Sequence, residues 1–372
     1  MAPPDCRWSP PITRKTCYSV LKTRPRPGPI CVWQGRCVTS HSGAATDADA
    51  AGSDAYQAGF AQRWGHLSQP HVRALAWLLD APDLLDPAAT EWQGRIATLG
   101  PLTPELVGWL NALDQQPEPL LQALGNRHHT RLGLYAEQLM AYYFAAHGRL
   151  HAHGLQVRAA RNDTVGEFDF LLRDAQGSSL QHIEFATKFY LLDPAMAGDF
   201  SGLIGPNLAD TLGAKMRKIF TQQLALSTHP AAQALLPLPV TQAQALVKGW
   251  LFYPPSAATQ MSGISSAHCH GYWITRAQAD TLQGECFVML PRLSWLAPVQ
   301  MPLAGAGEAS LLNLVELLQA LDDHQAQSAT PVLVAHLQQR GNAMVEQRRG
   351  FIVPDQWPAL AVQRRQSGAL PV

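Results

Sequence analysis

Two neighbouring segments, GEFDFLL (166–172) and QHIEFATKFYL (181–191), carry acidic residues and a lysine within otherwise apolar sequence. Both alternate with the period of a β-strand, on which residues two apart share a face. Glu184 and Lys188 therefore share one face of the second strand, and Asp169 lies on the more polar face of the first. Burying several carboxylates is costly unless a positive charge lies among them. We therefore expect these acids to surround a cation.

A divalent metal ion is the simplest candidate, because one ion can neutralise the acids of both strands. Ligands that are all oxygen, without His or Cys, favour Mg²⁺ or Mn²⁺. A metal held by carboxylates polarises a phosphoryl oxygen and activates water, and a nearby lysine orients that water or stabilises the developing charge. The pattern therefore indicates hydrolysis of a phosphodiester.

The elements that must position these residues follow from the period of the surrounding sequence. A helix is expected over 131–150, with Glu137 inside its otherwise apolar run. The three strands expected after it cover 154–160, 166–172 and 181–192. RDAQGS (173–178) is typical of a hairpin turn between the last two. An amphipathic helix over 205–227 and a strand over 245–255 then complete the order α-β-β-β-α-β.

Four parts of the chain follow from this pattern. Residues 1–55 are expected to form a disordered basic tail, because they are rich in Pro and then in small polar residues. A helical N-terminal portion (68–125), the α-β-β-β-α-β core (126–254) and a β-rich C-terminal α/β unit (255–360) follow. The expected fold class is α/β, a mixed sheet with helices on both faces.

The 372 residues carry no net charge, but the charge is unevenly distributed. Residues 1–46 hold seven Lys or Arg against one Asp, a net charge of +6, and the remainder holds 21 Lys or Arg against 27 Asp or Glu, a net charge of −6. This balance argues against a surface that binds nucleic acid indiscriminately, and it is compatible with one local basic groove.

Cysteine usage and hydropathy indicate the cellular compartment in which the protein is expected. Four of the six cysteines lie in the basic tail, the rest of the chain has only Cys269 and Cys286, and no CxxC pair is present. This excludes zinc-ribbon spacing and favours a reducing compartment. No apolar run approaches the ~20 residues needed to span a bilayer, and the basic N-terminus lacks the apolar core of a signal peptide. We expect a cytoplasmic protein that does not bind membranes.

The order of elements, with GEFD on the second strand and EFATK on the third, resembles the PD-(D/E)XK nuclease superfamily, including its RecB-like and Holliday-junction-resolvase-like branches. A narrower resemblance, over about residues 68–360, is to a bacterial family catalogued as domain of unknown function 1853. The stretches that carry it are QPHVRALAWLLDAPDLL, LGLYAEQL, GEFDFLL, EFATKFYL and WLAP.

The superfamily resemblance implies a Mg²⁺-dependent nuclease, with DNA as the expected substrate. By its pattern, Asp169 and Glu184 would ligate Mg²⁺ or Mn²⁺, Glu137 would support the metal from the helix, and Lys188 would be the catalytic lysine. In the superfamily the acid and the lysine are usually two residues apart. Here Glu184 and Lys188 are four apart, about 13 Å along a regular strand. Two interpretations remain: an active nuclease with a displaced motif residue, or a nuclease-like fold that binds nucleic acid or acts as a scaffold without cutting.

The second expected helix carries a polar stripe opposite its apolar face. Lys215, Lys218 and Gln222 stand at i, i+3 and i+7. Such a stripe could follow a phosphate backbone, and the Gln222–Gln223 pair resembles the glutamine-bearing helix of RecB-like nucleases. A solvated helix face without a binding role explains the same pattern.

Overall fold

The computed structural model describes residues 48–125, 129–160, 163–196, 198–255, 257–303 and 311–366. The chain divides into two units, Met1–Ala44 and Ala45–Val372, and every described residue belongs to the second. The disordered tail expected over 1–55 lies outside the described residues, except that 48–55 form the beginning of helix α1 (Ala48–Trp64). None of the described helices is long and apolar enough to cross a membrane.

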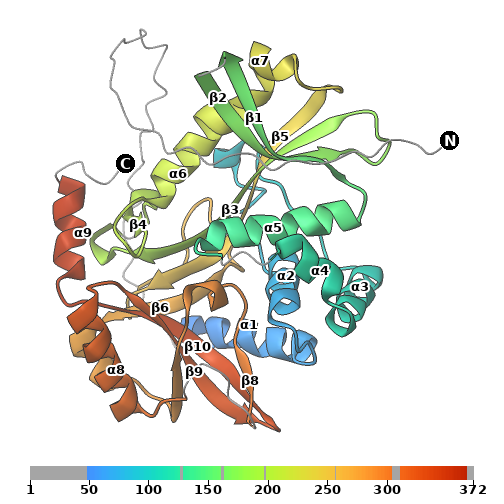
Figure 1. The fold of residues 1–372 in the computed structure, drawn as a ribbon. Helices are drawn as coiled ribbons and strands as arrows, with labels where there is room; N and C mark the ends of the chain where they lie inside the picture. Colours follow the sequence, from blue (N-terminus) through green and yellow to red (C-terminus); the bar gives the residue numbers. More distant parts are fainter. Residues whose placement is uncertain are drawn as a thin grey trace. The chain divides into compact units, whose positions relative to one another are not determined.

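One mixed sheet runs through this second unit (Figure 1). Its strands are β1 (Leu150–Ala160), β2 (Asp163–Arg173), β3 (Leu180–Leu192), β4 (Leu203–Ile204), β5 (Val240–Tyr253), β6 (Cys269–Thr275), β7 (Cys286–Met289), β8 (Gln300–Pro302), β9 (Val332–Arg340) and β10 (Ala343–Val353). They lie in the order β1-β2-β3-β5-β6-β10-β9-β7, with β4 beside β3 and β8 beside β10. The central strands β3, β5, β6 and β10 are parallel, and the flanking pairs are antiparallel.

The elements expected over 131–254 occur in the expected order. They are α5 (Leu132–Ala146), β1, β2, β3, α6 (Leu212–Lys218) and β5, with β4 and the short α7 (Pro230–Gln233) added. The C-terminal residues continue the same sheet, because β6 pairs with β5 and β10 pairs with β6. The fold is therefore a mixed α/β architecture whose sheet continues past the expected boundary at residue 254.

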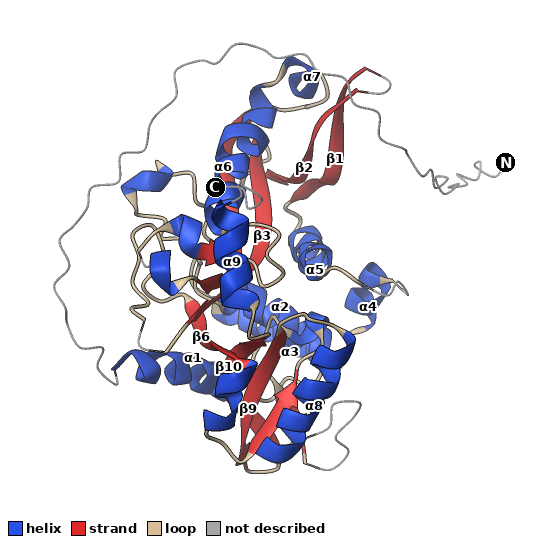
Figure 2. Cartoon of the chain, turned by 90° about the vertical axis from the view of Figure 1, so that its left-hand side faces the viewer, coloured by secondary structure: helices blue, strands red, loops and turns tan. Residues whose placement is uncertain are grey.

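Helices cover both faces of the sheet (Figures 1 and 2). The remaining helices are α2 (Pro70–Asp80), α3 (Pro104–Gln115), α4 (Glu118–Leu124), α8 (Leu314–Gln327) and α9 (Trp357–Gln366). Because side chains alternate along β3, Phe185 and Phe189 join the apolar core beneath α1–α5. Ala186 and Tyr190 pack on the opposite face with Leu212 of α6. The strand that carries Glu184 and Lys188 is therefore buried on both faces.

The β1–β2 hairpin separates from β3 part-way along the sheet. Pairing between β2 and β3 ends at Phe170 and Ile183, whereas β1 and β2 remain paired as far as Ala160 and Asp163. On its other side β3 stays paired with β5 as far as Leu191. Within the described residues, β3 therefore has an open edge between Ile183 and Leu191, where β4 begins to pair. The candidate site lies at this opening.

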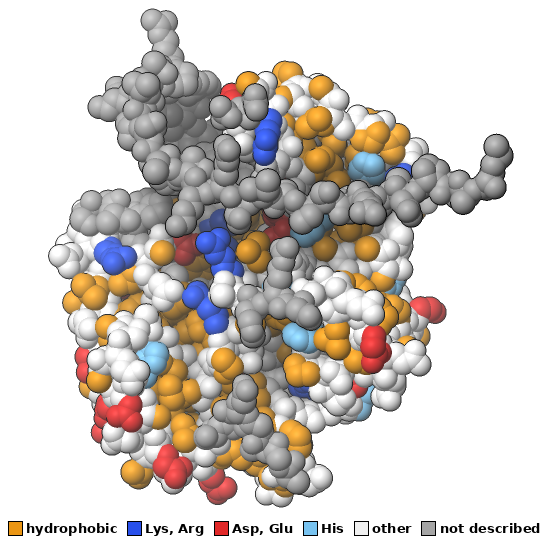
Figure 3. Space-filling model, viewed as in Figure 1, with side chains coloured by type: hydrophobic (Ala, Val, Ile, Leu, Met, Phe, Trp, Pro, Cys, Tyr) orange, Lys and Arg blue, Asp and Glu red, His pale blue; other side chains and the backbone are white. Residues whose placement is uncertain are grey.

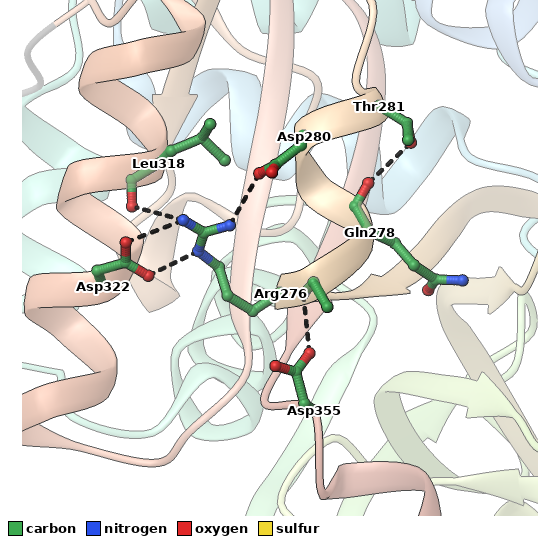
Figure 4. Close-up of polar contacts among 8 residues, drawn as sticks. Arg276, Gln278, Asp280, Thr281, Leu318, Asp322 and Asp355 are labelled. Carbon is green, nitrogen blue, oxygen red and sulfur yellow. Dashed lines mark hydrogen bonds and ion pairs between the residues drawn. The ribbon is translucent and has the colours of Figure 1, made fainter.

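A polar clamp connects α8 to the sheet in the C-terminal half (Figure 4). Arg276, in the 3-10 helix η6 (Arg276–Thr281), donates to both carboxylate oxygens of Asp322 at 2.7 and 2.9 Å, and to Asp280 at 3.1 Å. The carboxylate of Asp355 accepts from the backbone N–H of Ala277 at 2.8 Å. The guanidinium of Arg276 is thus shared by two carboxylates from two elements, which ties α8 to η6.

Candidate functional site

Asp169 and Glu184 meet where β2 and β3 separate. Oδ2 of Asp169 accepts a hydrogen bond of 3.0 Å from the backbone N–H of Phe185, in place of a strand partner. Glu184 is 1% exposed, and its carboxyl group is close enough to that of Asp169 for a hydrogen bond between them. Burial raises the pKa of Asp169 to about 7, aided by repulsion from Glu184. Burial likewise raises the pKa of Glu184 to about 7.

Two neutral side chains hold the Glu184 carboxylate. His182, on the same face of β3, shares a hydrogen bond of 2.8 Å with Oε1 through its Nε2. Burial lowers the pKa of His182 to about 4, so the ring is neutral near pH 7. Gln223 donates to Oε2 through its side-chain amide. Both oxygens of Glu184 are thereby oriented before any ligand arrives.

Lys215 lies near the two acids, although it forms no ion pair with either of them within the described residues. It extends from α6, and its Nζ donates to Oε1 of Gln223 at 3.2 Å. Burial and repulsion from Lys188 lower the pKa of Lys215, and attraction to Asp169 and Glu184 opposes that shift. Among the described residues, Asp169 and Glu184 therefore have one nearby ammonium group, and a fully ionised pair would remain short of positive charge.

Glu137 lies at the rim of the same cluster. It comes from α5, and its Oε1 shares a hydrogen bond of 2.8 Å with Nε2 of His153 on β1. Its charge contributes to the raised pKa values of Asp169 and Glu184. The structure thus brings Asp169 and Glu184 together and places Glu137 where its charge acts on both, with no contact to either within the described residues.

Lys188 has a different environment. Its Nζ lies 3.4 Å from Oδ2 of Asp210, which also accepts a hydrogen bond of 2.9 Å from the hydroxyl of Tyr190. No hydrogen bond or ion pair joins Lys188 to Asp169 or Glu184 within the described residues. The cause is the strand spacing, because the four residues after Glu184 carry Lys188 about 13 Å along β3.

The polar stripe of the second helix divides into buried and exposed positions. The regular helix begins at Leu212, later than expected, and passes into a π-helical segment, η4 (Ile219–Gln223). A π-turn inserts one extra residue, which shifts the side chains that follow it around the helix axis. Lys218 and Gln222 are exposed, whereas Gln223 turns inward to Glu184. The Gln222–Gln223 pair was visible in the sequence, but the helical period did not predict that Gln223, and not Gln222, points to Glu184.

Comparison with known proteins supports a family assignment. A family model described as Domain of unknown function (DUF1853) matches residues 73–353. The chain belongs to the DUF1853 family. The matched range contains the acids, Lys215 and Gln223, so the candidate site lies within the DUF1853 domain. No curated protein and no solved structure matches the chain.

The donor set of this DUF1853 domain suits Mg²⁺ better than zinc. Within the described residues, no group of three or more His, Cys, Asp or Glu side chains is arranged to hold a metal by itself. Zinc sites usually need three or four such ligands. Mg²⁺ is commonly bound by one or two carboxylates together with waters and substrate phosphates. Asp169 and Glu184 fit the second description, and their shortage of positive charge favours binding of a cation.

Proposed function

We propose that this protein is a Mg²⁺- or Mn²⁺-dependent hydrolase of phosphodiester bonds in nucleic acid, with DNA as the expected substrate. The contact between the half-buried carboxyl of Asp169 and the buried carboxyl of Glu184, each with a pKa raised to about 7, carries the proposal. Strongly perturbed acids that share a site are typical of catalytic and metal-binding positions.

Each neighbouring residue has a role in this proposal. Asp169 and Glu184 would hold the cation, which supplies polarisation of a phosphoryl oxygen and activation of water. Lys215 approaches both acids, so its ammonium group is suited to stabilise negative charge that develops on the phosphoryl group. Glu137 adds negative charge that favours a cation, and His182 and Gln223 hold Glu184 in one orientation.

The proposal includes a PD-(D/E)XK-type core over α5-β1-β2-β3-α6-β5. Three features support it: the order of elements, the acids at the point where β2 and β3 separate, and the parallel pairing of β3 with β5. In this core the lysine beside the acids is Lys215 of α6, and Lys188 of β3 occupies the adjoining hollow.

One observation favours a second function, a nuclease-like fold that binds nucleic acid or a partner without cutting. Lys188, the lysine expected to be catalytic from the strand pattern, is paired with Asp210 instead of with the acids. If Lys215 cannot replace it, the site binds a metal and does not cleave. The two functions therefore differ in cleavage, and both are compatible with metal binding.

Calorimetric titration of Mn²⁺ into the parent protein and into Asp169→Asn tests the metal site. Asparagine keeps an oxygen that accepts from the Phe185 N–H, so the substitution removes charge with little effect on the strand geometry. Asp163→Asn is the matched control, because it neutralises an exposed acid at the start of the same strand. We expect binding by the parent and by Asp163→Asn, and none by Asp169→Asn.

Cleavage assays then separate the two functions. Labelled single-stranded DNA, duplex DNA and single-stranded RNA are incubated with the parent protein in Mg²⁺ or Mn²⁺. Metal-dependent products that disappear in Asp169→Asn support the hydrolase. Metal binding without products from any of the three substrates would favour the non-cutting fold, and absence of metal binding in the parent, with DNA present as well, would reject the hydrolase.

A further inference from the structure

Farther along β3 than Glu184, the strand lines a hollow of about 320 Å³ at its open edge. Its lining includes Thr187 and Lys188 of β3, Arg131 at the beginning of α5, and Asp210. Arg292, in the 3-10 helix η7 (Arg292–Ser294), also lines this hollow. Lys188 connects the hollow to the cluster electrostatically, because its charge helps to lower the pKa of Lys215.

A second hollow of about 570 Å³ continues from the first. The two share Asn207, Arg292 and Trp295, so together they form one trench. The lining of the second hollow is mainly apolar and includes Leu290 and Val332. Figure 3 shows Lys and Arg side chains gathered near the middle of this face of the molecule. The trench therefore has a cationic half that begins at Lys188, about 13 Å along β3 from Glu184, and an apolar half farther away.

The cationic half has more positive charge than its own acid can neutralise. Asp210 pairs with Lys188, and the side chains of Arg131 and Arg292 form no ion pair within the described residues. The buried hydroxyl oxygen of Thr187 also has no hydrogen-bond partner among the described residues. Guanidinium groups that form no ion pair are donors suited to phosphate oxygens.

Arg292 also provides a flat surface at the junction of the two hollows. Its guanidinium carbon lies 5.4 Å from the centre of the Trp295 ring, which is 9% exposed beneath it. Nucleic-acid bases that are not paired stack on arginine planes as well as on aromatic rings. The outer face of Arg292 is exposed, so a base could stack there and enter the apolar half.

We propose that the trench binds one unpaired nucleic-acid strand, with its phosphates in the cationic half and a base on Arg292. The proposal rests on the proposed hydrolase for its class of ligand, and it deepens that function by selecting single-stranded over duplex substrate. Hollows of 320 and 570 Å³ have the size of small-ligand pockets, whereas duplex DNA is contacted over broad surfaces. A groove that combines positive charge with stacking surfaces is typical of proteins that bind single strands.

Fluorescence anisotropy in EDTA tests the trench independently of metal and cleavage. The protein is the full chain carrying Asp169→Asn, and the probes are a labelled 12-nucleotide DNA and the same sequence as a blunt duplex. We expect the single strand to bind about tenfold more tightly. Arg131→Ala and Arg292→Ala should each weaken single-strand binding about tenfold, the effect of one lost charged hydrogen bond. Each should also reduce the slope of log affinity against log salt by about 0.7.

Arg340→Ala is the matched control, because Arg340 is exposed at the far end of β9 and does not line the trench. Equal or tighter binding of the duplex would overturn the proposal, as would losses in Arg131→Ala and Arg292→Ala no larger than in Arg340→Ala. If the single-stranded DNA binds but the parent protein does not bind Mn²⁺, the hydrolase is rejected and the trench is kept. Metal binding and cleavage without a preference for single strands would keep the hydrolase and reject the trench.

Discussion

Asp169 accepts a hydrogen bond of 3.0 Å from the backbone N–H of Phe185, at the point where β2 and β3 cease to pair. The side chain of one strand therefore satisfies a backbone donor of its neighbour, which a paired strand would otherwise bind. This contact holds the acid at the opening between the strands, beside Glu184. It also lowers the pKa of Asp169, but burial has the larger effect and the net shift is upward.

The first prediction concerns pH. Because the pKa values of Asp169 and Glu184 are raised to about 7 in the folded state, that state binds more protons than the unfolded chain between about pH 4 and pH 7. Stability from this pair is therefore present at low pH and lost as pH rises through 7. Without divalent metal, we expect the pair to cost on the order of 3–5 kcal/mol at pH 8 relative to pH 5, about 1.4 kcal/mol for each pH unit and each group.

Urea unfolding at both pH values measures this difference, with Asp169→Asn as the comparison. The variant has one carboxyl group fewer, so its stability should fall less between pH 5 and pH 8. Mn²⁺ should restore the parent at pH 8 and have little effect at pH 5, where protons compete with it. A parent protein that shows no greater loss than Asp169→Asn would refute the raised pKa values.

The second prediction concerns which lysine serves the reaction. Lys215→Met should lower the rate of metal-dependent cleavage about 10²- to 10³-fold, because it removes the ammonium group next to both acids. Lys188→Met should have a smaller effect on the rate and a larger effect on KM, because Lys188 lies in the adjoining hollow. Steady-state kinetics on one DNA substrate distinguish them. A larger loss of kcat in Lys188→Met than in Lys215→Met would mean that Lys188 is the catalytic lysine.

The third prediction uses the two adjacent glutamines as a matched pair. Gln223→Ala removes the amide that donates to Glu184, so metal affinity or activity should fall about 10- to 100-fold. Gln222→Ala changes an exposed side chain and should leave both unchanged. Calorimetry with Mn²⁺ and a cleavage assay measure the two variants side by side. Equal effects in the pair would mean that the π-helical segment does not orient Gln223 as described.

The fourth prediction concerns stability far from the acids. Arg349 and Glu346 are each 0% exposed and are joined by hydrogen bonds of 2.6 and 2.8 Å. Arg349→Met would leave the Glu346 charge buried without its partner, so we expect a loss of about 3–5 kcal/mol in unfolding free energy. Arg340→Met, at an exposed position on β9, should cost little. Chemical denaturation compares them, and a loss below about 1 kcal/mol for Arg349→Met would contradict the prediction.

Several features of this protein follow from the sequence by itself. The period of two along 181–191 places Glu184 and Lys188 on one strand face and Phe185 and Phe189 on the other, because backbone geometry alone dictates alternation. The order α-β-β-β-α-β over 131–254 follows from the periods of the segments and the turn at 173–178. These are local properties, so neighbouring residues are enough to predict them.

Only the tertiary structure decided which polar groups meet. Lys215 lies 31 residues beyond Glu184, and its approach to the acids depends on how α6 packs on the sheet. The choice of Gln223 over Gln222 depends on a π-turn, and the pairing of Lys188 with Asp210 depends on the segment that follows β4. Packing angles, helix irregularities and the point at which two strands separate are set by contacts between distant segments. Local periodicity does not depend on those contacts, so it predicted the strand positions of Asp169 and Glu184 but not the residues around them.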